Sequence, residues 1–267
     1  MTLTTLNDGQ RVHCIQRAEA RVLDQHVSGY FNHGVALRDG DIVLDVGANV
    51  GVFALRAVTR FPNVKVYAFE PVPAIFAALD ANARDFGGGR LIPLNFGTSN
   101  APGELRFTYF PRSPALSTSA PEVWEQNPGV FADAVKGAAA SSDLWYARLV
   151  PGFLSGLIAK YLRGGGQEVV CPLRTLSQVI REQNIPRIDL LKVDCEGAEL
   201  ATLQGIEDEH WPLIRQVVAE VYDQDDRLQI VREMLLSRGL SQITIEQERG
   251  FEGLPLHNIF AVRPEAT

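Results

Sequence analysis

The run DIVLDVGANVG, residues 41–51, constrains the fold more than any other part of the chain. Its alternating apolar residues favour a strand as far as Val46, and Gly47 and Gly51 then form a turn that leads into a helical pattern. In a parallel α/β sheet such a turn lies at the carboxyl edge of the strands beside a helix N-terminus, where ligands bind. The run therefore predicts an α/β domain with a ligand site against this turn.

Strand and helix patterns alternate along the rest of the chain. Further strands are expected at 65–70, 90–96, 168–173, 188–194 and 214–222, and helices at 50–61, 73–86, 175–184, 197–206 and 226–239. This rhythm is typical of βαβ units in a mostly parallel sheet. The last two strands, 241–248 and 257–263, have no helix between them and are expected to pair antiparallel. Residues 103–110 alternate like a half-exposed strand, at a sheet edge or in a hairpin.

The chain divides into three parts. Residues 1–40 hold a short strand at 11–15 and a helix from about Ala18, and form a lead-in or cap; residues 41–110 and 167–267 form the core. Residues 111–166 are too long for a plain connection and too rich in aromatics for a linker, so they are expected to be a partly helical insertion. As a lid it would use Trp124, Trp145, Tyr146 and Phe153; the alternative is a structural insertion packed elsewhere.

Composition excludes several classes of protein. Hydrophobic residues make up 46% and charged residues 21%, as in ordinary globular domains. A net charge of -7 and a pI near 5.3 leave no global basic surface for nucleic acid. The longest apolar stretch, 149–162, is broken by Pro, Gly and Lys, and the N-terminus does not resemble a signal peptide, so no membrane association is expected. Three scattered cysteines predict free thiols and a cytoplasmic location.

The glycine turn itself favours one cofactor over another. The dinucleotide fingerprint G-x-G-x-x-G needs its second glycine so that the backbone can touch a pyrophosphate, but here the order is Gly47, Asn49, Gly51. S-adenosylmethionine has no phosphate and carries an amino-acid end. Asp45 would accept a hydrogen bond from its ammonium, directly or through water, and Asn49 with the turn amides would meet its carboxylate.

Polar residues end the other parallel strands as well. Glu70, followed by Pro71, ends the next strand, and its carboxylate suits two ribose hydroxyls of S-adenosylmethionine or of NAD. Asn95 and Phe96 end the third strand and are expected to border an adenine. Asp194 ends a later strand at the same crevice and is assigned to the cofactor or the active site. The alternative for the whole set is an ordinary βαβ domain with a glycine turn.

The later strands and the helix between them contain a second set of residues with oxygen-bearing side chains. Glu196 stands in the first turn of a helix, where capping also explains a carboxylate, and Glu220 and Tyr222 share one face of their strand. Together with Asp194 these oxygens would suit a divalent cation. No histidine reinforces the set, so we predict no metal.

Four local segments resemble a known family. They are DIVLDVGANVGVFAL, YAFEPVPAIFAAL, CPLRTLSQVI and IDLLKVDCEGAELATLQGI, and they are similar to the FkbM-type S-adenosylmethionine-dependent methyltransferases over roughly residues 20–263. The flanking sequence resembles the branch that is embedded in, or partnered with, polyketide and nonribosomal peptide synthases.

The resemblance implies a fold, a reaction and a set of cofactor residues. The fold is the class I methyltransferase, Rossmann-like α/β fold, with a mostly parallel seven-stranded sheet and helices on both faces. The reaction is O-methylation of a hydroxyl or enol on a natural-product intermediate, free or bound to a carrier protein. By this resemblance the S-adenosylmethionine site comprises Asp45, Gly47, Asn49, Gly51, Glu70, Pro71, Asn95, Phe96 and Asp194.

The catalytic base is left open by one departure from the family. Related synthase-associated members read EVHD where this chain reads EVYD, so Tyr222 stands in the place of the expected histidine, beside Glu220. A tyrosine has an ordinary pKa near 10 and is a poor base at neutral pH. Either the acceptor needs little help, or His257 or His33 serves, or Tyr222 only orients the acceptor. His13, His26 and His210 read as peripheral.

Three other functions remain at this point. An NAD-dependent oxidoreductase would use a similar sheet, and Asn49 argues against it. A non-catalytic module would bind the cofactor without turnover. Methyl transfer to RNA or protein is disfavoured by the acidic balance and by the lack of an NPPY-like motif. The identity of the acceptor and the oligomeric state do not follow from the sequence.

Overall fold

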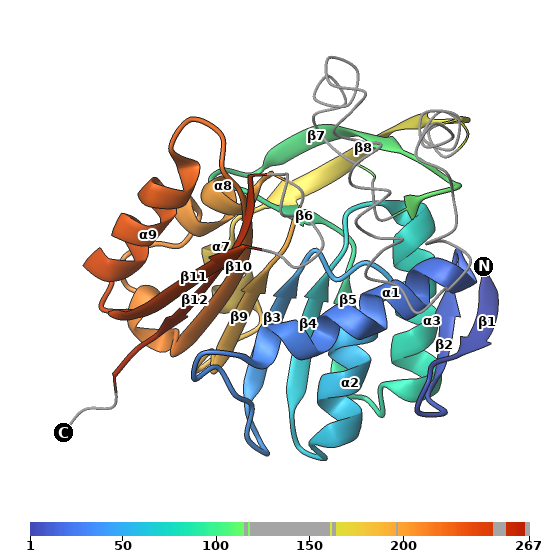
Figure 1. The fold of residues 1–267 in the computed structure, drawn as a ribbon, viewed down its shortest axis with the longest axis horizontal. Coiled ribbons are helices and arrows are strands. Elements are labelled where there is room, and N and C mark those ends of the chain that lie inside the picture. The colour runs from blue at the N-terminus through green and yellow to red at the C-terminus, as the bar shows by residue number, and fades with distance from the viewer. Residues whose placement is uncertain (115–116, 118–160, 162–163, 196, 248–254, 265–267) are drawn as a thin grey trace.

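The computed structural model describes residues 1–114, 117, 161, 164–195, 197–247 and 255–264. Its centre is a seven-stranded sheet in the order β11-β12-β10-β9-β3-β4-β5 (Figure 1). The parallel strands are β3 (Ile42–Val46), β4 (Lys65–Phe69), β5 (Leu91–Leu94), β9 (Leu190–Val193) and β10 (Gln216–Tyr222). β12 (Leu256–Val262) is antiparallel to both β10 and β11 (Gln242–Gln247). The predicted mostly parallel sheet and its final antiparallel pair are confirmed.

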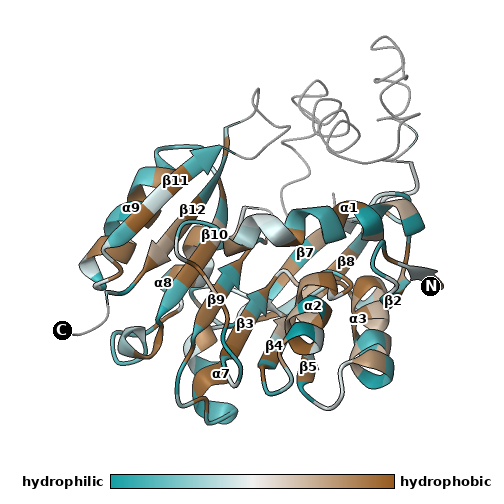
Figure 2. Cartoon of the chain, turned by 60° about the horizontal axis from the view of Figure 1, so that its bottom comes forward, coloured by the Kyte–Doolittle hydropathy of each residue, from teal (hydrophilic) through white to brown (hydrophobic). Residues whose placement is uncertain are grey.

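Helices cover both faces of this sheet, as predicted. Alternate residues of the buried strands pack to opposite sides: Val43 contributes to a core with α1 (Arg17–Val27), α2 (Val52–Arg60) and α3 (Pro73–Phe86). Leu44 contributes to a second core with α7 (Leu176–Glu182), α8 (Glu199–Gln204) and α9 (Arg227–Ser237). Figure 2 shows apolar residues along the central strands and on the helix faces that meet them. Between the two cores, the carboxyl ends of β4, β3 and β9 lie side by side.

A separate three-stranded sheet stands beyond these carboxyl ends, in the order β6-β8-β7 (Figure 1). Its strands are β6 (Gly97–Thr98), β7 (Gly103–Tyr109) and β8 (Gln167–Arg174). β7 and β8 pair antiparallel from Gly103↔Leu173 to Tyr109↔Gln167, so the two sides of the insertion lie next to each other. Residues 103–109 thus form an edge strand, but of this separate small sheet and with a partner distant in sequence, so they neither extend the large sheet nor form a short hairpin.

The expectation that 168–173 continues the parallel rhythm is wrong. β8 alternates exposed and buried positions and contains Pro172, whereas a central parallel strand is buried on both faces and needs every backbone N–H for pairing. Such a strand fits a small, half-exposed sheet better than the centre of the large one.

Residues 1–40 are joined tightly to the core. β1 (Thr2–Thr5), which the sequence patterns did not predict, pairs with β2 (Arg11–Cys14), and a short 3-10 helix, η1 (Ser28–Phe31), follows α1. The buried Asn82 side chain accepts a hydrogen bond from the N–H of His13 at 2.7 Å and donates to its carbonyl at 2.8 Å. Arg56 of α2 donates from Nε to Asp24 of α1 at 2.7 Å. The Asn82 bonds join β2 to α3, and the Arg56 bond joins α1 to α2.

Two structural observations concern the cysteines and membrane-spanning helices. Cys14 and Cys171 are buried and Cys195 is half-buried, and all three are free thiols. Among the described residues, no helix combines the length and the apolar character needed to span a bilayer.

Candidate functional site

A pocket opens at the point where the strand order reverses. β3 lies between β4, which follows it in the chain, and β9, which comes much later. Ligands of open α/β sheets bind at such a point, outside the carboxyl ends of the strands. The pocket is bounded by the turn after β3, the ends of β4 and β9, helix α1 and the small sheet. Its polar lining residues are His26, Tyr30, Asn49, Glu70, Thr98, Ser117, Lys192, Asp194 and Cys195.

The turn after β3 depends on glycine at one position for steric reasons. Gly47 has φ 75°, and a Cβ placed on it would lie 1.7 Å from the backbone oxygen of Asp194. Its N–H donates to the carbonyl of Phe69 at 3.1 Å, which ties the turn to β4. Asn49 adopts φ 52°, and its Oδ1 accepts from the N–H of Val50 at 2.7 Å. The turn is therefore closed against both neighbouring strands.

Glu70 is held with its carboxylate at the pocket. Oε2 accepts from the N–H of Asn49 at 3.1 Å and Oε1 accepts from the N–H of Val72 at 2.8 Å. Asn95 supports this loop, because its Nδ2 donates to the backbone oxygen of Glu70 at 2.9 Å and to that of Pro71 at 3.3 Å. Burial raises the pKa of Glu70 from 4.5 to about 7, although the two N–H donors oppose the shift. Each oxygen keeps a lone pair for a further donor.

A buried group of charges lies under the pocket between β3 and β9. Asp45 and Lys192 are directly paired residues of these strands, so their side chains share a face. Lys192 Nζ lies 3.2 Å from Asp45 Oδ1 and 3.3 Å from Asp194 Oδ2. Tyr30 donates its hydroxyl hydrogen to Asp194 Oδ2 at 2.9 Å. Lys192 thus connects an acid buried in the sheet to an acid at the pocket.

These contacts determine the charges of the group. Burial alone lowers the pKa of Lys192, but Asp45 and Asp194 outweigh it and raise the pKa above its ordinary value. Burial raises the pKa of Asp45, and Lys192 opposes that shift. Burial and the Asp194 charge both raise the pKa of Tyr30 well above 10. Lys192 is therefore a cation and Tyr30 a neutral hydrogen-bond donor at neutral pH.

The structure brings five of the nine expected cofactor residues to the pocket wall: Gly47, Asn49, Glu70, Pro71 and Asp194. Asp45 is fully buried behind Lys192, and Gly51 packs against Leu79 of α3. Asn95 supports the Glu70 loop, as described above.

Phe96 lies outside the described pocket lining as well. Its ring meets that of Phe69 edge-on with centroids 5.7 Å apart, and the guanidinium of Arg174 lies 5.0 Å from its centroid. Neither Asn95 nor Phe96 lines the described pocket, so the adenine contacts expected of them remain predictions.

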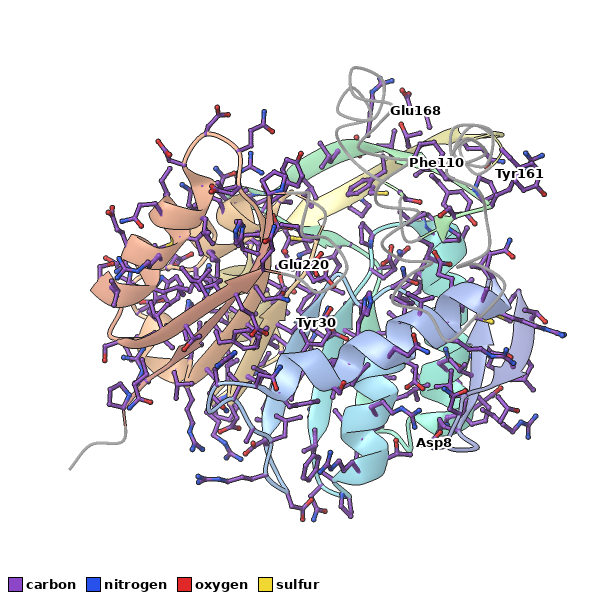
Figure 3. All side chains as sticks on the ribbon, in the orientation of Figure 1. Asp8, Tyr30, Phe110, Tyr161, Glu168 and Glu220 are labelled. Carbon is purple, nitrogen blue, oxygen red and sulfur yellow. The ribbon has the colours of Figure 1, made fainter. Side chains whose placement is uncertain are left out.

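None of the four expected catalytic residues lines the described pocket. Glu220 and Tyr222 point to the same face as Lys192, because Val218 pairs with Lys192 two residues before Glu220. Glu220 lies near enough to Tyr30 for its charge to add to the raised pKa of that hydroxyl (Figure 3). Both residues nevertheless belong to β10, which β9 separates from β3 and its turn.

The two histidines expected as alternative bases are also placed elsewhere. His33 Nε2 lies 2.9 Å from Glu246 of β11, and its ring packs edge-on against Phe260. His257 pairs with Val221, whose side chain belongs to the core under α7, α8 and α9, so His257 faces the other side of the sheet. The roles assigned to these residues remain predictions, and the geometry does not bring them to the pocket.

Several residues of the pocket wall were missed from the sequence, among them Tyr30, His26 and Lys192. Tyr30 and His26 come from η1 and α1, where no local motif marks them as functional. Lys192 did carry a signal, since a lysine inside the apolar run IDLLKVD requires a buried partner. The carboxylates on either side of it were recognised, and their counter-ion was not.

Parts of two other expectations fall outside the described residues. Glu196, the helix-capping and metal-ligand candidate, is one, and the proposed lid aromatics Trp124, Trp145, Tyr146 and Phe153 are the others. Of the insertion's described ends, Pro114 and Ser117 line the pocket. Arg112 donates to the backbone oxygen of Tyr161 at 2.9 Å, so the two ends are linked.

A separate cluster of possible metal ligands, Glu207, Glu209 and His210, is explained by other contacts. Arg181 holds both oxygens of Glu207, at 2.5 and 2.9 Å. His210 Nδ1 lies 2.8 Å from the hydroxyl of Ser177. The cluster therefore links α7 to the loop before β10, and it does not line the pocket.

Comparison with known proteins gives one family and several relatives. The model of the methyltransferase FkbM domain matches residues 45–252. The chain is 36% identical over 262 residues to 31-O-demethyl-FK506 methyltransferase FkbM of Streptomyces tacrolimicus, covering 97% of this chain and 95% of that protein. It is 34% identical to methyltransferase sdnD of Sordaria araneosa, covering 79% of this chain and 78% of the relative. It is 32% identical to AMB antimetabolite synthetase AmbE of Pseudomonas aeruginosa, covering 97% of this chain and 12% of that synthetase.

Proposed function

The chain belongs to the FkbM methyltransferase family, as its sequence motifs predicted, and on this premise we propose that it transfers the methyl group of S-adenosylmethionine to a hydroxyl oxygen of a small-molecule biosynthetic intermediate. The observation that carries the proposal is the pocket at the strand reversal, with the closed turn at Gly47 between the carboxylates of Glu70 and Asp194. The rest of the pocket wall is largely apolar.

The residues present fit S-adenosylmethionine. Glu70 offers lone pairs on two oxygens to the vicinal ribose hydroxyls, and its neighbours Val72 and Ile75 give an apolar wall for an adenine. Asp194 is the other carboxylate among the described lining residues and suits the ammonium of the molecule. Asp45 is fully buried and paired with Lys192, so it does not reach the ligand. We therefore assign to Asp194 the contact with the ammonium that the sequence suggested for Asp45.

S-adenosylmethionine supplies an electrophilic methyl group on a positively charged sulfur, ready for in-line attack by an oxygen nucleophile. The chain's own residues bind and orient. Lys192 and Tyr30 both hold Oδ2 of the Asp194 carboxylate, and the Gly47 turn closes against the Asp194 backbone oxygen. The apolar residues Leu105, Phe107 and Leu173 of the small sheet exclude water from one wall. Such positioning supplies a large share of the rate in a displacement of this kind.

The names of the relatives support a small-molecule acceptor. One is a methyltransferase of a 31-O-demethyl compound, and another is a synthetase of which this chain spans 12%. We therefore propose a free or carrier-tethered hydroxyl as the acceptor, and S-adenosylmethionine as its methyl donor.

Isothermal titration with S-adenosylhomocysteine tests the cofactor, with NAD as the competing ligand. Binding of S-adenosylhomocysteine and none of NAD is expected. Transfer of tritium from methyl-labelled S-adenosylmethionine then tests turnover, with 31-O-demethyl-FK506 and a carrier-tethered hydroxyacyl chain as probe acceptors. Binding of NAD alone would refute the proposal. Binding of S-adenosylhomocysteine without transfer to any hydroxylated acceptor would indicate a non-catalytic module.

Glu70→Gln is expected to weaken S-adenosylhomocysteine binding about 10- to 100-fold. The substitution keeps the size of the side chain but turns one acceptor oxygen into a donor, and hydrogen bonds to a charged group contribute about 1.5–3 kcal/mol. Titration calorimetry measures the change. Glu104→Gln, at an exposed position of β7, is the matched control and should leave affinity within about twofold.

Binding should also depend on pH through Glu70. The pKa of its carboxyl is raised to about 7 in the free protein, and the ionised form is the better acceptor for ribose hydroxyls, so binding releases a proton. Affinity is expected to rise between pH 6 and pH 8 and then to level off, by up to about tenfold per pH unit below 7. Glu70→Gln should abolish this slope, and an unchanged slope in the variant would assign it to another group.

A further inference from the structure

His26 lines the pocket from α1, although its sequence position marks it as peripheral. Its Nε2 is shielded from solvent and has no hydrogen-bond partner among the described residues. A buried polar nitrogen without a partner is unfavourable, and a hydroxyl placed in the pocket would satisfy it. We propose that His26 is the general base that accepts the proton of the acceptor hydroxyl during methyl transfer; this inference rests on the proposed function.

The position of His26 along the pocket supports this role. The carboxyl ends of β4, β3 and β9 lie in a row, so the pocket runs from Glu70, past the Gly47 turn, to Asp194. With the ribose at Glu70 and the ammonium at Asp194, the sulfur of a bound donor would lie between these two carboxylates. His26 and Asp194 both line this pocket, His26 from α1 and Asp194 from the end of β9. The Nε2 of His26, unpartnered among the described residues, is therefore available to an acceptor hydroxyl in the same pocket as the donor.

The groups around His26 keep its imidazole neutral at physiological pH. Burial lowers its pKa, and the charge of Asp194 partly opposes this. The other charged or titratable groups on this side are Lys192 of β9, Tyr30 of η1, Glu70 after β4 and Asp45 of β3. Asp24, on the same helix, is held by Arg56. A neutral imidazole is able to accept a proton, as a base must.

The step balances without any further reactant. The acceptor oxygen forms a bond to the methyl carbon, and the bond from that carbon to sulfur breaks with its electron pair left on sulfur. The hydroxyl proton passes to Nε2 of His26, and the imidazolium then loses it to solvent. The products are the methyl ether, S-adenosylhomocysteine and one proton.

The position of His26 is tested by NMR titration without any acceptor. The imidazole signal is assigned by its absence from His26→Gln, and its pKa is measured in the complexes with S-adenosylhomocysteine and with S-adenosylmethionine. The two ligands differ by one methyl group and one positive charge. A nearby sulfonium should lower the pKa of His26 by at least about 0.5 relative to the neutral product. Equal pKa values in the two complexes would overturn the inference.

Kinetics test the role. With 31-O-demethyl-FK506 as the probe acceptor, His26→Gln is expected to lower kcat about 10²- to 10⁴-fold and to remove the fall of kcat at low pH. Calorimetric affinity for S-adenosylhomocysteine should stay within about twofold, which also verifies folding. His13→Gln is the control, because His13 pairs with Asp85 and stacks on Phe86 away from the pocket.

The outcomes separate the two proposals. Retained kcat and pH profile in His26→Gln would overturn the base assignment and leave the proposed function intact. Failure of the unmodified protein to bind S-adenosylhomocysteine would instead remove the proposed function. If the probe acceptor is not turned over, the NMR comparison alone decides the inference.

Discussion

Gly47→Ala is expected to abolish detectable S-adenosylhomocysteine binding, with a loss of at least about 100-fold. The added Cβ would lie 1.7 Å from the backbone oxygen of Asp194 and 2.7 Å from its carbonyl carbon. Backbone atoms cannot rotate away as a side chain can, so β3 and β9 must separate at their carboxyl ends. That movement displaces the turn and Asp194, the two central parts of the pocket. Titration calorimetry measures the affinity, and thermal unfolding measures the accompanying loss of stability.

Gly40→Ala separates this clash from the cost of the backbone conformation. Gly40 also has positive φ, 85°, but a Cβ there meets nothing within 4 Å. It should lose only about 1–2 kcal/mol of stability from the left-handed conformation and keep its affinity. Equal losses of affinity in the two variants would mean that backbone conformation, and not contact with Asp194, makes glycine necessary at position 47.

Lys192→Met should lower the free energy of unfolding by about 3–5 kcal/mol, because it leaves two carboxylates without their shared cation. Asp45 is 0% exposed and Lys192 3% exposed, so water does not replace the lost ammonium. Chemical denaturation at pH 7 measures the effect. Burial already raises the folded-state pKa of Asp45 above its unfolded value. Folding therefore favours the protonated carboxyl, and stability falls as the pH rises through the folded-state pKa. The deficit of the variant should therefore shrink toward acidic pH.

Two further variants make the Lys192 result specific. Lys65→Met removes the exposed lysine at the start of β4 and should cost less than about 1 kcal/mol. Adding Asp45→Asn to Lys192→Met removes one unpaired charge and should recover part of the lost stability. If the double variant is no more stable than Lys192→Met, the pairing with Asp45 does not explain the loss.

Local sequence patterns predicted most of the fold, because hydrophobic periodicity indicates which face of each single helix or strand is buried. The helix expected at 73–86 coincides with α3, Pro73–Phe86, and the strand expected from Asp41 differs from β3 by one residue. β1 was missed, since the sequence TLTT carries no apolar alternation. The sheet to which β8 belongs was assigned wrongly, because its partner β7 is separated from it by the insertion and periodicity does not identify partners.

The residues of the site also fall into two groups: those that the local sequence marks and those that tertiary contacts bring to the pocket. The glycines, Glu70 and Asp194 were recognisable because each follows a parallel strand, and topology alone brings such positions to one edge. His26 and Tyr30 reach the pocket because α1 packs across that edge, a tertiary contact with no local signature. Alternation predicted that Glu220 and Tyr222 share one face of their strand, which is the face of Lys192, but the period does not give their distance from the turn.

The antiparallel pair of β7 and β8 has a consequence for the history of this protein. Tyr109 and Gln167 are paired neighbours, so the chain leaves the small sheet and returns to it at almost the same place. A segment inserted between such residues can change in length and composition without straining the strands that present it. The sequence between Tyr109 and Gln167 is therefore free to diverge as a unit while the pairing of β7 with β8 is kept.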